Sequence, residues 1–186
     1  MSYSIVKLAK ILEYDFYIIK KDRRCLKSGR SLTGNGVGEL RIGRAIDEVR
    51  SRCRITHDAI ELDEEAQPQR TMTVVTAYGD LLVAVDSGRI WRITPTASTI
   101  RTADSLGVGS NITDLLNSSS GKGFEGEGAL YVVLKKQCGL SFRLAYDIPY
   151  ADHREKWRLT DLQRIPKSVK VDQVFAVGCD KSANSE

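Results

Sequence analysis

Short turns between β-rich segments are the feature that most constrains this chain. The segments 71–77, 81–86 and 89–94 are rich in Val, Ile and Thr, and they are separated only by Tyr78-Gly79-Asp80 and Asp86-Ser87-Gly88. Strands joined by so few residues must pair antiparallel, because a parallel pair needs a crossover of a dozen or more residues. The pattern therefore predicts a three-stranded antiparallel meander.

A second meander is predicted further along the chain, over residues 129–135, 140–146 and 169–177. A turn at Gln137-Cys138-Gly139 joins its first two strands, and a polar excursion, residues 147–167, precedes the third. Two meanders of this size fit within the 186 residues as one compact body.

Each meander follows a similar stretch of sequence. Residues 40–49 and 106–115 share a pattern: an apolar residue, then a glycine (Gly43 or Gly109), then an Ile, and finally an acidic residue followed by an aliphatic one. We expect each stretch to open a short helix, with Ser110 as the N-cap of the second, since its hydroxyl accepts a backbone N–H. The predicted fold class is α+β: two helix-plus-three-stranded antiparallel meander repeats, with an N-terminal amphipathic helix.

The charge of the chain is concentrated at its start. The formal net charge is +4, whereas residues 1–30 carry eight basic and three acidic side chains, so the rest is nearly neutral. Apolar residues at helical spacing in this extension predict an amphipathic helix, which either packs on the body or lies on an anionic membrane surface or in a partner's groove. The helix is marked by Ile5, Leu8, Leu12 and Ile19.

The predicted domains follow from these segments. Residues 1–37 form the basic extension and a flexible Gly/Ser linker, and residues 38–179 form the body. The body divides into repeats 38–100 and 101–179, and residues 180–186 are expected to be a disordered tail.

Composition excludes several classes of protein. A nearly neutral body offers no continuous basic groove, so no nucleic-acid partner is expected. No window approaches the roughly 18–20 apolar residues of a membrane-spanning helix. Charged residues interrupt the N-terminal apolar stretch, so it is no secretory signal; the chain is cytoplasmic as written, or its export signal is absent.

Four cysteines allow three pairings. Cys138 sits in the turn of the second predicted meander and Cys179 closes its last strand, so adjacent antiparallel strands can bring them together and we expect them to form a disulfide. Cys53 is interpreted as a small buried hydrophobic residue, and Cys25 lies in the extension. No Cys-x-x-Cys pair occurs, so neither a zinc site nor any other metal or cofactor is predicted.

Catalytic signatures are not assembled anywhere in the sequence. The two histidines, His57 and His153, stand in polar segments without a marked nucleophile, and the acids of residues 58–65 are typical of a solvated loop. The alternative is a small hydrolytic or ligand-binding protein that uses His57 or His153 beside those carboxylates. A buried pocket that brings either histidine to a carboxylate would favour that alternative.

Surface residues of the kind found at binding hot spots remain. Strand alternation places Trp91 on the same face as Arg89 and Ile93. We therefore predict a non-enzymatic protein that binds another protein through its sheet face or through the excursion 147–167. The predicted binding residues are Arg89, Trp91, Arg92, Arg143, Trp157 and Arg158.

The segment Ile42-Gly43 to Glu48-Val49, followed by a meander, resembles the module of the superfamily that contains the β-lactamase-inhibitor protein and SmpA/OmlA (BamE-like) proteins. The tandem layout over residues 38–179 is similar to that of the inhibitor protein. The resemblance implies a periplasmic or secreted protein of the bacterial envelope that binds proteins on its sheet face, as an inhibitor or an assembly factor. The chain departs from that pattern in lacking an export signal and a lipidation cysteine, and in its long excursion.

Overall fold

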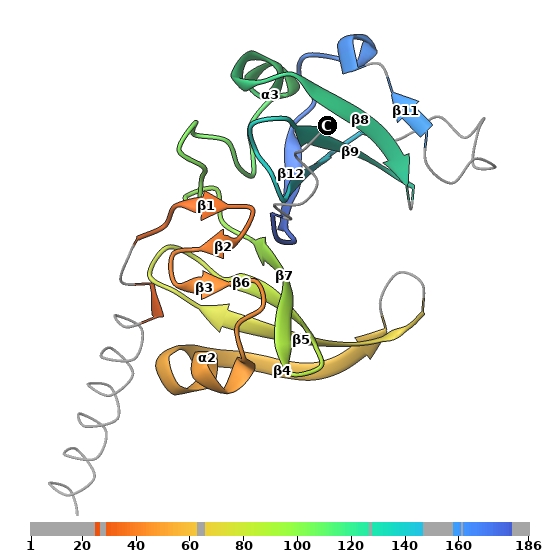
Figure 1. The fold of residues 1–186 in the computed structure, drawn as a ribbon. Coiled ribbons are helices and arrows are strands. Elements are labelled where there is room, and N and C mark those ends of the chain that lie inside the picture. Colours follow the sequence, from red (N-terminus) through yellow and green to blue (C-terminus); the bar gives the residue numbers. More distant parts are fainter. Residues whose placement is uncertain are drawn as a thin grey trace, which may run out of the picture.

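The computed structural model describes residues 25–26, 29–62, 66–126, 128–146, 158–160 and 162–179. The predicted helix over residues 5–19, the tail 180–186, His153 and Trp157 lie outside these residues. In the described part the chain is mostly β, with one nine-stranded and one three-stranded sheet (Figure 1). All strand pairs within the two sheets are antiparallel.

The first half of the described chain forms the small sheet, one helix and four long strands. In chain order these are β1 (Leu32–Thr33), β2 (Gly36–Val37), β3 (Leu40–Arg41), α2 (Ile46–Arg52), β4 (Arg54–Leu62), β5 (Pro68–Val75), β6 (Leu81–Asp86) and β7 (Arg89–Pro95).

The second half adds one helix, a 3₁₀ turn and five strands. They are α3 (Ile112–Ser118), β8 (Gly121–Gly126), β9 (Ala129–Leu134), β10 (Leu140–Leu144), β11 (Arg158–Thr160), η2 (Leu162–Arg164) and β12 (Val171–Ala176). The large sheet has the order β11-β8-β9-β10-β12-β7-β6-β5-β4, so the two halves of the chain meet where β12 lies beside β7.

The prediction of an α+β fold with two helix-plus-three-stranded-meander repeats is wrong. The two described α-helices have only seven residues each, and four strands follow α2 in the large sheet. Of the strands that were missed, β4 lies at the sheet edge and is largely exposed on both faces, so its sequence lacks the apolar alternation that marks a half-buried strand. β8 was missed because three of its six residues are glycine.

The segment predicted as a flexible linker is folded. It contains β1 and β2, and its Leu32 and Val37 are fully buried, at 1% and 0% exposure. The turn between them reaches the end of the large sheet, where Gly178 donates its N–H to the Gly34 carbonyl at 2.8 Å. A Cβ on Gly34 would lie only 1.8 Å from the Cys138 carbonyl oxygen, so this close contact requires glycine.

The two helices are entered through turns with the same backbone pattern. Gly43 and Gly109 have φ of +82° and +86°, a region that favours glycine. The Gly43 N–H donates to Ile90 at 2.7 Å, and the Gly109 N–H donates to Val171 at 2.8 Å. Both turns are thereby attached to the beginnings of β7 and β12, the two strands at the centre of the large sheet.

The predicted N-cap of the second helix is displaced by one residue. The N-cap is Asn111, whose own N–H donates to the Asp114 carboxylate at 2.8 Å. Ser110 is buried instead, where its hydroxyl accepts the Gly107 N–H and an N–H of Arg101. A buried hydroxyl needs such partners, because burial without hydrogen bonds is costly.

One hydrophobic core joins the helices, the small sheet and one face of the large sheet. Side chains alternate along the strands, so that on β6 Leu81 and Val83 are buried while Leu82 is 45% exposed. Figure 1 shows α2, the small sheet and α3 along the same side of the large sheet. Within the described residues, neither α-helix covers the other face of the large sheet, which is called the open face below.

Two disulfides tie the core to the rest of the chain. Cys138 and Cys179, the pair expected from sequence, are joined with their Cα atoms 5.2 Å apart. Cys53 is buried as interpreted, but it is also bonded to Cys25, one of the possible pairings that was not predicted for these two cysteines. The second bond fastens the chain before the small sheet to the end of α2.

Candidate functional site

The open face of the large sheet is hollowed into a groove of about 550 Å³. It extends across the centre of the sheet, from the edge strand β4 to β8, and so uses both halves of the chain. The lining residues are His57, Glu61, Thr71, Met72, Thr73, Leu82, Val83, Ala84, Trp91, Arg92, Thr94, Phe124, Tyr131, Ser141, Gln173, Phe175 and Val177.

A β-bulge places both Trp91 and Arg92 at this groove. In the β6–β7 ladder Ala84 pairs with Arg92 and Val85 pairs with Ile90, so Trp91 is the extra residue. The expected strict alternation, with Trp91 on the face of Ile93, is therefore wrong: Ile93 is fully buried, whereas Trp91 is half-buried and lines the groove.

Aromatic rings and one guanidinium form a continuous stack along the groove floor. The rings of Phe124 and Tyr131 stack with centroids 5.5 Å apart, and Tyr131 lies 6.1 Å from Phe175. The Arg92 guanidinium carbon lies 5.4 Å from the Phe175 ring centroid and 4.7 Å from that of Trp91. These are distances of aromatic stacking and cation–π attraction, so the floor is held in a defined arrangement.

Aliphatic side chains on the same face remain exposed to solvent. Leu82 is 45%, Val133 36% and Val177 46% exposed. Together with the aromatic stack they make an apolar surface over both halves of the sheet. Contiguous apolar surfaces of this kind mark interaction sites in soluble proteins.

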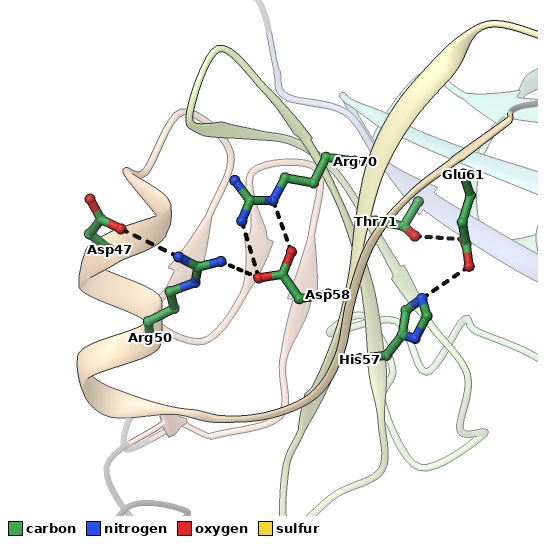
Figure 2. Close-up of polar contacts among 7 residues, drawn as sticks. All are labelled: Asp47, Arg50, His57, Asp58, Glu61, Arg70 and Thr71. Atoms are coloured by element: carbon green, nitrogen blue, oxygen red, sulfur yellow. Dashed lines mark hydrogen bonds and ion pairs between the residues drawn. The ribbon is translucent and has the colours of Figure 1, made fainter.

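A hydrogen-bonded histidine and glutamate stand at the edge of the groove on β4. His57 Nε2 lies 3.0 Å from Glu61 Oε1, and the Thr71 hydroxyl donates to Glu61 Oε2 at 2.7 Å (Figure 2). The Thr71 hydrogen bond, followed by that of His57, lowers the pKa of Glu61 below its ordinary value. The two side chains are 47% and 52% exposed, so the pair lies at an open rim and not in a buried pocket.

The opposite side of β4 carries a separate ion cluster. Asp58 accepts hydrogen bonds from Arg70, at 2.8 and 3.2 Å, and from Arg50 of α2 (Figure 2). The Arg70 hydrogen bonds, aided by Arg50, hold the pKa of Asp58 below its ordinary value against the effect of burial. This cluster joins α2 to the β4–β5 hairpin, so Asp58 is not available to His57. Asp58 and Glu61, two of the carboxylates expected beside His57, thus lie on opposite sides of β4.

The predicted binding residues are only partly brought together. Trp91 and Arg92 line the groove, and Arg143, next to Tyr131 in the ladder, is engaged by Asp172 at 2.9 Å through two hydrogen bonds. Arg89 lies elsewhere and donates to the Gly43 carbonyl at 2.8 Å. Trp157 is outside the described residues, and Arg158 belongs to β11 at the far sheet edge.

Sequence reasoning missed Phe124, Tyr131 and Phe175. The alternation of side chains along β12 was an available signal. Val174 and Ala176 are apolar and face the core, so Phe175 between them must face away from it.

The described residues contain neither a cluster suited to a metal ion nor a helix suited to crossing a membrane. No group of three or more His, Cys, Asp or Glu side chains in that part of the chain is arranged to hold a metal ion. No helix within the same residues has the length and apolar character to cross a membrane.

The fold, a nine-stranded antiparallel sheet with one covered and one open face, has a counterpart among solved structures. The crystal structure of the uncharacterized protein YfeY from Escherichia coli matches with a TM-score of 0.55 and 16% sequence identity, covering 78% of this chain and 97% of that one. At this identity the likeness shows the fold alone. No protein-family model and no curated protein sequence matches the chain.

Proposed function

We propose that this chain is a non-enzymatic protein-binding module that holds its partner on the open face of the large sheet. The observation that carries the proposal is the groove floor, where aromatic rings, exposed aliphatic side chains and Arg92 share one face. Trp, Tyr and Arg are the residue types that dominate binding energy at protein interfaces.

The disulfides support a further part of the proposal, the compartment. Both pairs of cysteines are bonded, and structural disulfides persist in oxidising environments such as the periplasm and the extracellular space. This agrees with what the resemblance to the β-lactamase-inhibitor and BamE-like proteins implies. We therefore include an inhibitor-like or assembly role in the bacterial envelope in the proposal.

A photo-crosslinking experiment in cells of the native host tests the binding face. A benzophenone amino acid is placed at Leu82 in the groove or, as the control, at Leu62 on β4, which is 71% exposed and is not among the groove-lining residues. The proposal predicts one adduct that forms from the Leu82 position only.

The captured protein is then purified and its affinity is measured with the full chain. Leu82→Asp is expected to weaken binding at least tenfold, because it places a charge in the apolar groove, while Leu62→Asp is expected to change it less than twofold. Equal affinities of wild type and Leu82→Asp would exclude the open face as the binding site.

The His57–Glu61 pair favours a second candidate function, a small hydrolytic or ligand-binding protein. A carboxylate that orients an imidazole is a common part of a general base, although here both side chains are exposed at the rim. A panel of chromogenic ester, amide and phosphate substrates tests this candidate. Turnover that is lost in His57→Gln and retained in Arg70→Gln would support it; no turnover by the wild type would exclude hydrolysis of those substrate classes.

A further inference from the structure

Among the described residues, Arg92 lies beside two aromatic rings of the groove and, unlike Arg50, Arg70 and Arg143, forms no ion pair with a carboxylate. We infer that the groove recognises an acidic side chain on a protein loop, whose carboxylate binds Arg92 between apolar contacts. The inference rests on the proposed function and adds the chemistry of the partner.

The surroundings of Arg92 hold its guanidinium in place without neutralising it. The Trp91 and Phe175 rings lie 4.7 and 5.4 Å from its central carbon, and one Nη2 hydrogen bond goes to Gln69 at 3.0 Å. A guanidinium has five N–H donors, so most of them remain available. Within the described residues no carboxylate oxygen lies within 4.0 Å of Arg92.

Arg143 provides the contrast on the same face. Its Nε and Nη2 both donate to Asp172 at 2.9 Å, the two-pronged arrangement in which one arginine satisfies one carboxylate. Arg92 presents the same chemical fork at the centre of the sheet, where β7 meets β12, but no carboxylate of the described residues pairs with it. Charge complementarity therefore favours a partner that supplies a carboxylate to Arg92.

The neighbours of Arg92 indicate that the carboxylate is carried by a protein loop. Leu82 and Val177 line the same groove and are 45% and 46% exposed. A free small carboxylate would cover Arg92 and leave these side chains in water, whereas a loop covers them together. Apolar contacts around an ion pair exclude water and strengthen the attraction between the charges.

Selection of disulfide-closed, seven-residue random loops on the immobilised full-length protein tests the inference. We expect Asp or Glu at one fixed position of the selected loops, next to aliphatic or aromatic residues. The best loop and its Asp→Asn or Glu→Gln version are then titrated against the wild type, Arg92→Gln, Arg92→Lys and the control Arg70→Gln, whose arginine pairs with Asp58 on the opposite side of β4.

The expected result is a loss of at least tenfold in affinity for Arg92→Gln, a smaller loss for Arg92→Lys and less than twofold for Arg70→Gln. Neutralising the acid of the loop should weaken binding to the wild type by a similar factor but not to Arg92→Gln, as in a double-mutant cycle. Urea unfolding of each variant establishes that the fold is intact, and Arg92→Lys keeps the comparison valid if Arg92→Gln is unstable.

Other outcomes separate the inference from the proposed function. Loops that depend on Leu82 and Val177 but carry no fixed acid would overturn the inference and leave the binding face intact. Loops that bind Leu82→Asp as well as the wild type would overturn both. Displacement of the loops by millimolar acetate or benzoate would show a site for small carboxylates and would overturn the protein-loop inference.

Discussion

The disulfide between Cys138 and Cys179 makes a contribution to the stability of this fold that can be calculated from the length of chain it closes. It closes 41 residues of chain, and the chain-entropy relation assigns about 3.9 kcal/mol at 25 °C to a loop of that length. The bond between Cys25 and Cys53 closes 28 residues, which corresponds to about 3.6 kcal/mol. From loop closure alone, alanine in place of both cysteines of either pair would lower the free energy of unfolding by nearly the same amount.

The two pairs differ in what surrounds them. At the Cys138–Cys179 disulfide, Cys179 donates its N–H to the Asn35 side chain at 2.9 Å, and Gly34 lies against Cys138. We therefore expect the Cys138→Ala/Cys179→Ala protein also to lose native contacts of the small sheet, and its deficit to exceed that of Cys25→Ala/Cys53→Ala.

Urea unfolding followed by far-UV circular dichroism measures these deficits. With an m-value of about 2 kcal/mol/M, the first variant should unfold at a urea concentration roughly 2 M lower than the oxidised wild type. The wild type reduced with dithiothreitol is the control, because it loses both bonds without a substitution. A deficit below about 1 kcal/mol for the Cys138→Ala/Cys179→Ala protein would refute the reasoning.

Three further substitutions test the rest of the structure. Asp58→Asn removes a carboxylate whose pKa in the folded protein is below its ordinary value, so this carboxylate stabilises the fold above about pH 4 and stops doing so as the pH falls further. The free energy of unfolding should therefore decline less from pH 6 to pH 3 in this variant than in the wild type, and equal declines would contradict the prediction. Gly34→Ala should lower the free energy of unfolding, measured with urea, by about 3 kcal/mol or more, because the new Cβ meets Cys138. Gly88→Ala should lower it by about 1–2 kcal/mol, because its Cβ would meet open space at φ +74°; equal costs would exclude the close contact. Phe142→Ala, at 0% exposure, should cost about 3–5 kcal/mol, and Leu62→Ala less than about 0.5 kcal/mol; a small cost for Phe142→Ala would place it outside the core.

Local sequence patterns were sufficient where the strands are half-buried and the turns are tight. The segment 81–86 is a strand with the bounds that were predicted, because alternating burial and the following Asp86-Ser87-Gly88 turn both act over a few residues. The pairing of Cys138 with Cys179 belongs to the same class, since it follows from two neighbouring strands.

The candidate site was accessible from sequence only in part. Trp91 and Arg92 were named, but their common position depends on a bulge in the β6–β7 ladder, and strict alternation cannot show a bulge. Phe175 comes within stacking distance of Arg92 only because β12 pairs with β7, a contact between residues more than 80 positions apart.

The sequence by itself determined local features: several of the strands, the positions where glycine permits a turn, and the pairing of the cysteines that lie beside the ends of β10 and β12. The tertiary structure decided the fold class, the burial of the segment read as a linker, and the composition of the groove. The physical reason is that hydrogen bonding and alternation act between near neighbours, whereas the pairing of sheet edges and the packing of Gly34 against Cys138 depend on distant segments meeting.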